Sequence, residues 1–170
     1  MSDDAGARTR PKEASTWRPH VVIITDDHDL REFLGQGLLY AGFWTSAIAS
    51  GLQAIEVFRL RSFDLILVDA GIGGLSAPEM IRRLRTGTRP HGAPLTSVPV
   101  VVIAEGLGPS DEAWSELAAA DLIVRPPLEL DQLATALFRT IGAWRAANPD
   151  VPWADAPPPQ SRGPRGEEPV

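Results

Sequence analysis

Short apolar segments alternate along the chain with segments in which apolar residues recur every three or four positions. The apolar segments at 21–25, 63–69 and 98–104 are nearly uniform, without the alternation of a strand that has one face in water. Weaker segments of the same kind lie at 43–48 and 121–124. Short, uniformly apolar strands are typical of a parallel sheet that is buried on both faces, so the pattern predicts five strands in such a sheet.

The segments between these strands have the spacing of amphipathic helices. Helices are expected over about 29–40, 50–61 and 111–120, and two more begin near Ala77 and Leu130. Strand and helix alternate five times, which predicts an α/β fold of three layers with helices on both faces of the sheet. The residues expected to face the core are Leu30, Phe33, Leu34 and Leu38 in the first helix, Leu52, Ile55 and Phe58 in the second, Met80, Ile81 and Leu84 in the third, and Leu130, Leu133, Leu137, Ile141 and Trp144 in the last.

Composition divides the chain into three parts. Residues 1–19 are polar and contain two prolines, so we expect a disordered N-terminal extension. Residues 20–146 hold all the predicted elements and are expected to form one domain, in keeping with a chain of 170 residues. Residues 147–170 are rich in proline and charge, which predicts a flexible tail.

The composition also excludes several classes of function. Apolar residues make up 44% and charged residues 22% of the chain, as in ordinary soluble globular domains. The formal net charge of −6 disfavours general attraction to nucleic acid or to an anionic membrane. The sequence has no cysteine, no apolar run long enough to span a membrane and no signal-peptide pattern. We therefore expect a cytoplasmic protein without disulfides or thiol chemistry.

Three aspartates follow two of the predicted strands. Asp26 and Asp27 stand side by side after the first strand, and Asp69 closes the third. The carboxyl ends of neighbouring parallel strands meet at one edge of a sheet, where the sites of such folds form, so these carboxylates can converge. A single aspartate after a strand is usually a turn residue or a helix cap. The combination of all three instead indicates a site for a hard cation such as Mg²⁺.

Four segments resemble the receiver domain of bacterial response regulators: IITDDHDLREFL, FDLILVDAGIGGLS, VPVVVIA and ADLIVRPP. Their order and spacing also agree with that family, and the match covers 20 to about 146. The resemblance implies a (βα)5 flavodoxin-like fold. It further implies that Asp69 accepts a phosphoryl group, that Asp27 binds Mg²⁺ directly and Asp26 through water, and that the backbone carbonyl of Gly71 completes the protein ligands.

The positions that report phosphorylation in this family are altered here. The family carries a serine or threonine hydroxyl at the end of the fourth strand, where this chain has Ala104. Leu122 replaces an aromatic residue, and Arg125 replaces a lysine, which keeps the charge but not the shape. The resemblance also implies a cis peptide bond between Arg125 and Pro126. The metal-binding half of the predicted site is therefore complete, whereas the half that senses phosphate is changed.

Several functions stay open at this point. The chain can be a receiver that accepts phosphate on Asp69 and relays it by another route, or a pseudo-receiver that binds other proteins without phosphorylation; neither would be an enzyme. The segment DHDLR also approximates the signature of haloacid-dehalogenase-type phosphatases, with Asp27 as nucleophile and Asp29 as acid/base. Arg31 and Ala104 stand where those phosphatases need hydroxyl residues. Cobalamin-binding domains share the Asp-x-His pattern but need a glycine at the position of Arg31.

The expected partners follow from the receiver resemblance. A histidine kinase or a phosphotransfer protein would supply the phosphoryl group. About two dozen residues follow the last helix, which is too few for a helix-turn-helix output domain. We therefore expect either a stand-alone receiver or a fragment of a longer protein. We therefore expect output through a second copy or a partner protein at helices four and five, which carry Trp114 and Phe138. Direct contact with nucleic acid or membranes is not expected.

Overall fold

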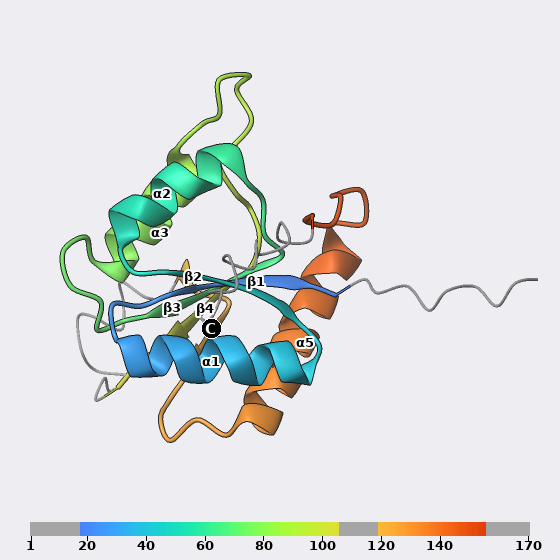
Figure 1. The fold of residues 1–170 in the computed structure, drawn as a ribbon. Coiled ribbons are helices and arrows are strands. Elements are labelled where there is room, and N and C mark those ends of the chain that lie inside the picture. Colours follow the sequence, from blue (N-terminus) through green and yellow to red (C-terminus); the bar gives the residue numbers. More distant parts are fainter. Residues whose placement is uncertain (1–17, 106–118, 156–170) are drawn as a thin grey trace, which may run out of the picture.

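The computed structural model describes residues 18–105 and 119–155. Five strands form one parallel sheet in the order β2-β1-β3-β4-β5, and helices lie on both sides of it (Figure 1). The elements are β1 His20–Ile24, α1 His28–Ala41, β2 Trp44–Ile48, α2 Gly51–Leu60, β3 Leu65–Asp69, α3 Ala77–Thr86, β4 Val100–Ile103, β5 Leu122–Val124 and α5 Leu130–Ala147. The predicted α/β class, with three layers and a five-stranded parallel sheet, is confirmed.

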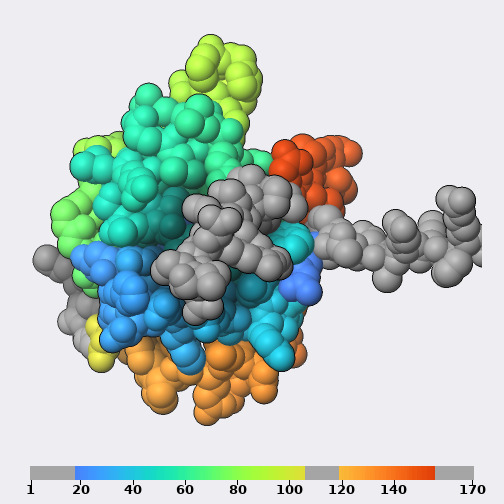
Figure 2. Space-filling model, in the orientation of Figure 1, coloured from blue at the N-terminus to red at the C-terminus, as the bar shows by residue number. Residues whose placement is uncertain are grey.

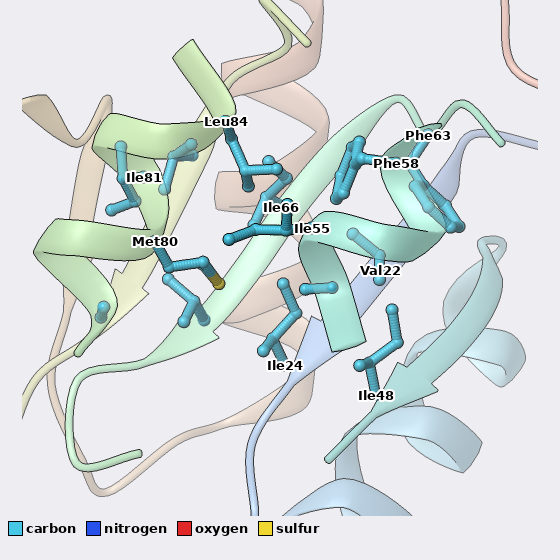
Figure 3. Close-up of a cluster of buried hydrophobic side chains, with 14 of the residues drawn as sticks. Val22, Ile24, Ile48, Ile55, Phe58, Phe63, Ile66, Met80, Ile81 and Leu84 are labelled. Atoms are coloured by element: carbon cyan, nitrogen blue, oxygen red, sulfur yellow. The ribbon is translucent and has the colours of Figure 1, made fainter. Parts of the chain in front are cut away.

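Both faces of the central strands are buried, which explains why these strands are apolar throughout. Alternate residues contribute to two separate layers. The layer shown in Figure 3 joins the sheet to α2 and α3 and contains Val22, Ile24, Ile66, Val68, Val102, Ala54, Ile55, Phe58, Met80, Ile81 and Leu84. The layer on the opposite face joins the sheet to α1 and α5 and contains Val21, Ile23, Leu65, Leu67, Val101, Leu34, Leu38, Leu133, Leu137 and Ile141.

Local signals fix the helix ends near the aspartates. Asp27 caps α1, because its side chain accepts a hydrogen bond from the amide of Leu30 at 3.1 Å. Ser76 caps α3, and Pro78 lies in the first turn, where a missing N–H group costs no helical hydrogen bond. At its other end α1 stops at Gly42, whose φ of 112° is rarely adopted by residues with a side chain. The loops after β1 and β3 therefore lead into helices that begin at defined residues.

Two residues expected to face the core are exposed instead. Leu52 is 59% exposed and Phe33 is 44% exposed. The buried face of α2 runs through Gly51 and Phe58 rather than through Leu52. A side-chain carbon at Gly51 would lie only 3.2 Å from the carbonyl oxygen of Leu75. Because α2 approaches the loop before α3 so closely, the inward position holds Gly51, and its neighbour Leu52 lies on the exposed side of the helix.

The chain beyond α5 turns back onto the domain up to residue 155, although the sequence predicts a flexible tail from 147. The buried carboxylate of Asp64 accepts hydrogen bonds from the amides of His20, at 2.7 Å, and Ala154, at 2.9 Å. The same carboxylate pairs with Arg145 at 3.1 Å, and the Arg145 guanidinium lies 3.7 Å from the centre of the Trp153 ring. These contacts hold the segment at the amino ends of β1 and β3, opposite the three aspartates.

Other predictions fall on parts of the chain outside the described residues. These are the N-terminal extension up to 17, the tail from 156, and most of the helix predicted over 111–120, including Trp114. Phe138, the other aromatic residue noted on the expected interaction face, is 42% exposed and stacks on Phe43 with ring centres 4.2 Å apart.

Candidate functional site

The three predicted aspartates lie at the carboxyl ends of two adjacent strands. Asp69 is the last residue of β3, and Asp26 and Asp27 directly follow β1. The two strands are parallel neighbours, with Ile24 opposite Val68 in the register. The register explains why residues far apart in sequence reach the same edge of the sheet.

Both carboxylate oxygens of Asp69 accept a hydrogen bond. The Thr25 hydroxyl donates to Oδ2 at 2.8 Å, and the amide of Gly71 donates to Oδ1 at 2.9 Å. The bond to Thr25 is partly buried, whereas the bond to Gly71 is exposed. Asp69 therefore presents Oδ1 toward solvent and Oδ2 toward β1.

The other two aspartates are exposed and have different local roles. Asp26 Oδ2 accepts a hydrogen bond from the amide of Gly73 at 3.1 Å, which links the end of β1 to the loop after β3. Asp27 Oδ1 accepts the bond from Leu30 that caps α1. One oxygen of each carboxylate is thus used to fix the backbone around the edge of the sheet.

The donor set has the chemistry that Mg²⁺ prefers, since it consists of carboxylate and backbone oxygens. Among the residues that the structure describes, however, no three acidic or histidine side chains lie close enough together to hold a metal ion. Asp27 and Asp26 each use one carboxylate oxygen to accept a hydrogen bond from a backbone amide. The Mg²⁺ site of Asp26, Asp27, Asp69 and Gly71 therefore stays a prediction.

The altered switch positions lie at the ends of β4 and β5. Ala104 is fully buried after β4, and its amide donates to the carbonyl of Val124 at 2.9 Å. Leu122 begins β5 and packs against the layer formed with α1 and α5. Arg125 follows β5 and is exposed. No side chain at these positions offers a hydroxyl or an aromatic ring.

The predicted cis peptide bond is displaced by one residue. The cis bond joins Pro126 to Pro127, so the prediction of a cis bond between Arg125 and Pro126 is wrong. Both bonds precede a proline, and the cis form is therefore accessible at either position. The sequence of the proline doublet does not distinguish between them.

Two polar groups at this edge were not found from the sequence. The Thr25 hydroxyl contacts Asp69, and the Arg31 guanidinium donates to the carbonyl of Thr25 at 3.0 Å. The only local signal was the position of Thr25 between an apolar strand and the aspartate pair. Because Thr25 and Asp69 are distant in sequence, their contact depends on the register of β1 and β3.

The arginine-rich face of α3 is partly neutralised by its own carboxylate. Arg82 and Arg83 both donate to Glu79, at 2.6 and 2.9 Å. Hydrogen bonds from Arg82 and Arg83 lower the pKa of the Glu79 carboxyl to about 2. Arg85 faces Asp121 at 3.6 Å. This pairing reduces the positive charge that the arginines of α3 offer to a nucleic acid.

A groove of about 660 Å³ lies between α1 and the start of α5, away from Asp69. Its lining includes Phe33, Tyr40 and Leu130 together with Asp29 and Asp131. Figure 2 shows α1, in blue, directly above the first part of α5, in orange.

No helix in the described ranges is both long and apolar enough to cross a membrane.

Comparison with curated proteins gives response regulators and transcriptional regulatory proteins among the relatives, although no protein-family model matches the chain. MtrA, a DNA-binding response regulator of Mycobacterium bovis, is 30% identical over 118 residues, which are 68% of this chain and 48% of that protein. CseB, a transcriptional regulatory protein of Streptomyces avermitilis, is 29% identical over 110 residues, which are 65% of this chain and 43% of that protein. The chain therefore spans less than half the length of these relatives.

The fold is that of solved receiver domains. The chemotaxis response regulator CheY4 of Vibrio cholerae has a TM-score of 0.63 and 18% identity, with 73% of this chain and 99% of that chain covered. The receiver domain of a sensor histidine kinase from Pseudomonas aeruginosa, described with a magnesium ion in its active-site cleft, has a TM-score of 0.63 and 19% identity. That match covers 74% of this chain and 99% of the other. The chain contains a receiver domain of the response-regulator family. The flavodoxin-like architecture expected from the sequence is thereby confirmed.

Proposed function

We propose that Asp69 is the phosphoacceptor of this receiver. The observation that carries the proposal is the position of its carboxylate at the partly exposed carboxyl end of β3, with Oδ1 toward solvent and Oδ2 held by Thr25. In the transfer, Oδ1 of Asp69 forms a bond to phosphorus. The bond between phosphorus and the donor, an acyl phosphate or a phosphohistidine, breaks, and its electron pair leaves with the donor.

We further propose that the receiver uses Mg²⁺, with Asp26, Asp27, Asp69 and the carbonyl of Gly71 as its protein ligands. A bound Mg²⁺ would supply charge neutralisation for the transferring phosphoryl group. The oxygen-only donor set at one edge of the sheet supports this role. The related receiver from Pseudomonas aeruginosa that is described with magnesium supports it as well.

The phosphorylated form would lack two contacts that receivers normally use. Ala104 has no hydroxyl to bind the phosphoryl group, and Leu122 has no ring to follow such a movement. Arg125 can supply a positive charge and hydrogen-bond donors to phosphate in place of a lysine. We infer that phosphorylation shifts the conformational equilibrium of this receiver less than in a receiver with the usual residues.

Phosphoryl transfer can be tested by intact-mass measurement of the full chain after incubation with acetyl phosphate and Mg²⁺. The wild-type protein should gain the mass of one phosphoryl group, and Asp69→Asn should not. Equal labelling of both proteins would refute Asp69 as the acceptor, and absence of labelling in both would refute phosphoryl transfer from this donor.

A second function is favoured by the spread of the carboxylates and by the altered switch residues. A pseudo-receiver would bind a partner protein without phosphorylation, and it has no need for a preformed group of three metal ligands. The two functions differ in a simple readout. Partner binding should survive Asp69→Asn in a pseudo-receiver, whereas a phosphorylation-dependent receiver should lose its response to acetyl phosphate.

The partners follow from the same proposal. We propose a histidine kinase or a phosphotransfer protein as phosphodonor in the cytoplasm, and a second copy or another protein at helices four and five as the recipient of the signal. Turnover of a small substrate is not part of this function. A phosphatase of the haloacid-dehalogenase type would instead use Asp27 as nucleophile, and it would hydrolyse a chromogenic phosphate ester that a receiver leaves intact.

A further inference from the structure

We propose that the Thr25 hydroxyl is the positioning group of the Asp69 carboxylate, which it holds for phosphoryl transfer in a site that has no hydroxyl at Ala104. This inference rests on the proposed function of Asp69. In the expected arrangement a hydroxyl reaches the site from the end of β4, but here the residue that follows β4, Ala104, is a fully buried alanine. The hydroxyl that does contact Asp69 comes from the end of β1, on the other side of β3.

The contacts of Thr25 determine the direction of its hydroxyl proton. The side-chain oxygen accepts a hydrogen bond from the amide of Asp27 at 3.2 Å. A hydroxyl has one proton to donate, and the Asp69 carboxylate, 2.8 Å away, can only accept when it is ionised. The Thr25 hydroxyl therefore donates to Asp69 and accepts from Asp27. This chain connects the backbone of one predicted metal ligand to the side chain of the phosphoacceptor.

Thr25 is itself held in place from several directions. The residue is 1% exposed, and its amide donates to the carbonyl of Ile48 on β2 at 3.1 Å. Its carbonyl accepts the bond from Arg31 at 3.0 Å, which ties it to the first turn of α1. A hydroxyl fixed in this way can hold a carboxylate in one orientation, which a mobile side chain could not do.

The two oxygens of Asp69 acquire different roles from this arrangement. Oδ2 is bound on the partly buried side by Thr25, whereas Oδ1 meets only the exposed amide of Gly71 in the described contacts. Oδ1 is therefore the oxygen that forms the bond to phosphorus. As the donor leaves with its electron pair, Oδ2 becomes the carbonyl oxygen of the acyl phosphate, which still accepts the bond from Thr25. The same hydroxyl thus serves the reactant and the product without rearrangement.

The inference can be tested with initial rates of phosphoryl incorporation into the full chain, followed by intact mass over a series of acetyl phosphate concentrations with Mg²⁺. Thr25→Val keeps the shape of the side chain but removes the hydroxyl, and Thr25→Ser keeps the hydroxyl but removes the methyl group. Thr45→Val is the matched control, because its hydroxyl donates to the carbonyl of Gly35 at 3.1 Å and has no contact with Asp69 in the structure.

We expect Thr25→Val to lower the maximal rate about tenfold, since hydrogen bonds to charged groups and correct orientation contribute effects of this order. The acetyl phosphate concentration at half-maximal rate should change little, because Thr25 does not touch the donor. Thr25→Ser should retain a rate near that of the wild type, and Thr45→Val should match the wild type. Rescue by serine separates the hydroxyl from a general effect on folding, and urea unfolding of each variant checks that it is folded. Should Thr25→Val not fold, Thr25→Ala compared with Thr25→Ser makes the same test.

Three outcomes would overturn the inference. A wild-type rate in Thr25→Val would show that the hydroxyl is not needed, while Asp69 would still be the acceptor. An equal loss in Thr25→Ser and Thr25→Val would show that any change of this side chain lowers the rate, and would assign the effect to its packing rather than to the hydroxyl. A wild-type protein that gains no phosphoryl group would overturn the function of Asp69 and this inference with it.

Discussion

Replacing Asp64 with asparagine should remove the central contact that holds residues 148–155 on the domain. The Asp64 side chain is only 1% exposed and its two oxygens accept hydrogen bonds from His20, Ala154 and Arg145. An asparagine keeps one carbonyl oxygen but turns an NH2 group toward a backbone donor. It also leaves the charge of Arg145, whose side chain is 13% exposed, without its carboxylate.

The magnitude follows from the burial of this pair. Removing one partner of a buried ion pair costs about 3–5 kcal/mol, mainly because the other charge stays buried without compensation. Asparagine retains part of the hydrogen bonding, so we expect a loss of about 3 kcal/mol in the free energy of unfolding. Domains of this size are stable by roughly 5–15 kcal/mol, and the loss should therefore be a large fraction of the total.

Urea unfolding followed by tryptophan fluorescence measures this loss. Trp153 stacks on the Arg145 guanidinium, so its emission should report release of the segment. The matched control is Asp29→Asn, because the Asp29 side chain is fully exposed and we expect its urea midpoint to be unchanged. An Asp64→Asn midpoint as close to the wild type as that of Asp29→Asn would refute the argument that this buried network stabilises the fold.

Three further predictions concern pH, the switch and the metal. Burial lowers the pKa of His20 below its ordinary value of 6.5. Below pH 6.5 the unfolded state therefore binds more protons than the folded state, and the free energy of unfolding decreases as the pH falls. Above pH 6.5 the histidine is neutral in both states and this loss is absent. Urea midpoints between pH 7 and about pH 5 should therefore fall more steeply in the wild type than in His20→Gln. Beryllofluoride, which stands in for the phosphoryl group, should shift few amide resonances in the wild type and more in Ala104→Thr combined with Arg125→Lys; large shifts around residues 119–140 of the wild type would contradict this. Magnesium titration should show weaker binding in Asp27→Ala than in Asp26→Ala, and wild-type protein that binds no magnesium near neutral pH would exclude the metal site.

The sequence was sufficient for the architecture because its signals are local. Uniform apolar strands predict a sheet that is covered on both faces, and a parallel sheet places strand-end residues such as Asp26 and Asp69 at one edge. The inner residues Met80, Ile81 and Leu84 were likewise predicted from their spacing alone, and all three are buried. These predictions depend on local sequence patterns and on the assumption that the first and third strands are neighbours in the sheet.

The remaining features depend on contacts between distant residues. The bond from Thr25 to Asp69 requires the register of β1 against β3, and the contacts of Asp64 with Arg145 and Ala154 join residues 81 and 90 positions apart in the sequence. A composition rich in proline and charge gave no sign that 148–155 would pack on the fold. The exposure of Leu52 depends on the close approach of Gly51 to a loop, which periodicity does not encode.

Reductive trapping with borohydride tests the central claim, phosphorylation of Asp69, most directly. Borohydride reduces an aspartyl phosphate to homoserine with release of phosphate, and peptide mass spectrometry then locates the modified position. After incubation with acetyl phosphate and Mg²⁺, we predict homoserine at position 69 and unchanged aspartate at positions 26 and 27. Homoserine at position 27 would contradict the account and favour the phosphatase nucleophile, and no homoserine at any of the three positions would favour a pseudo-receiver.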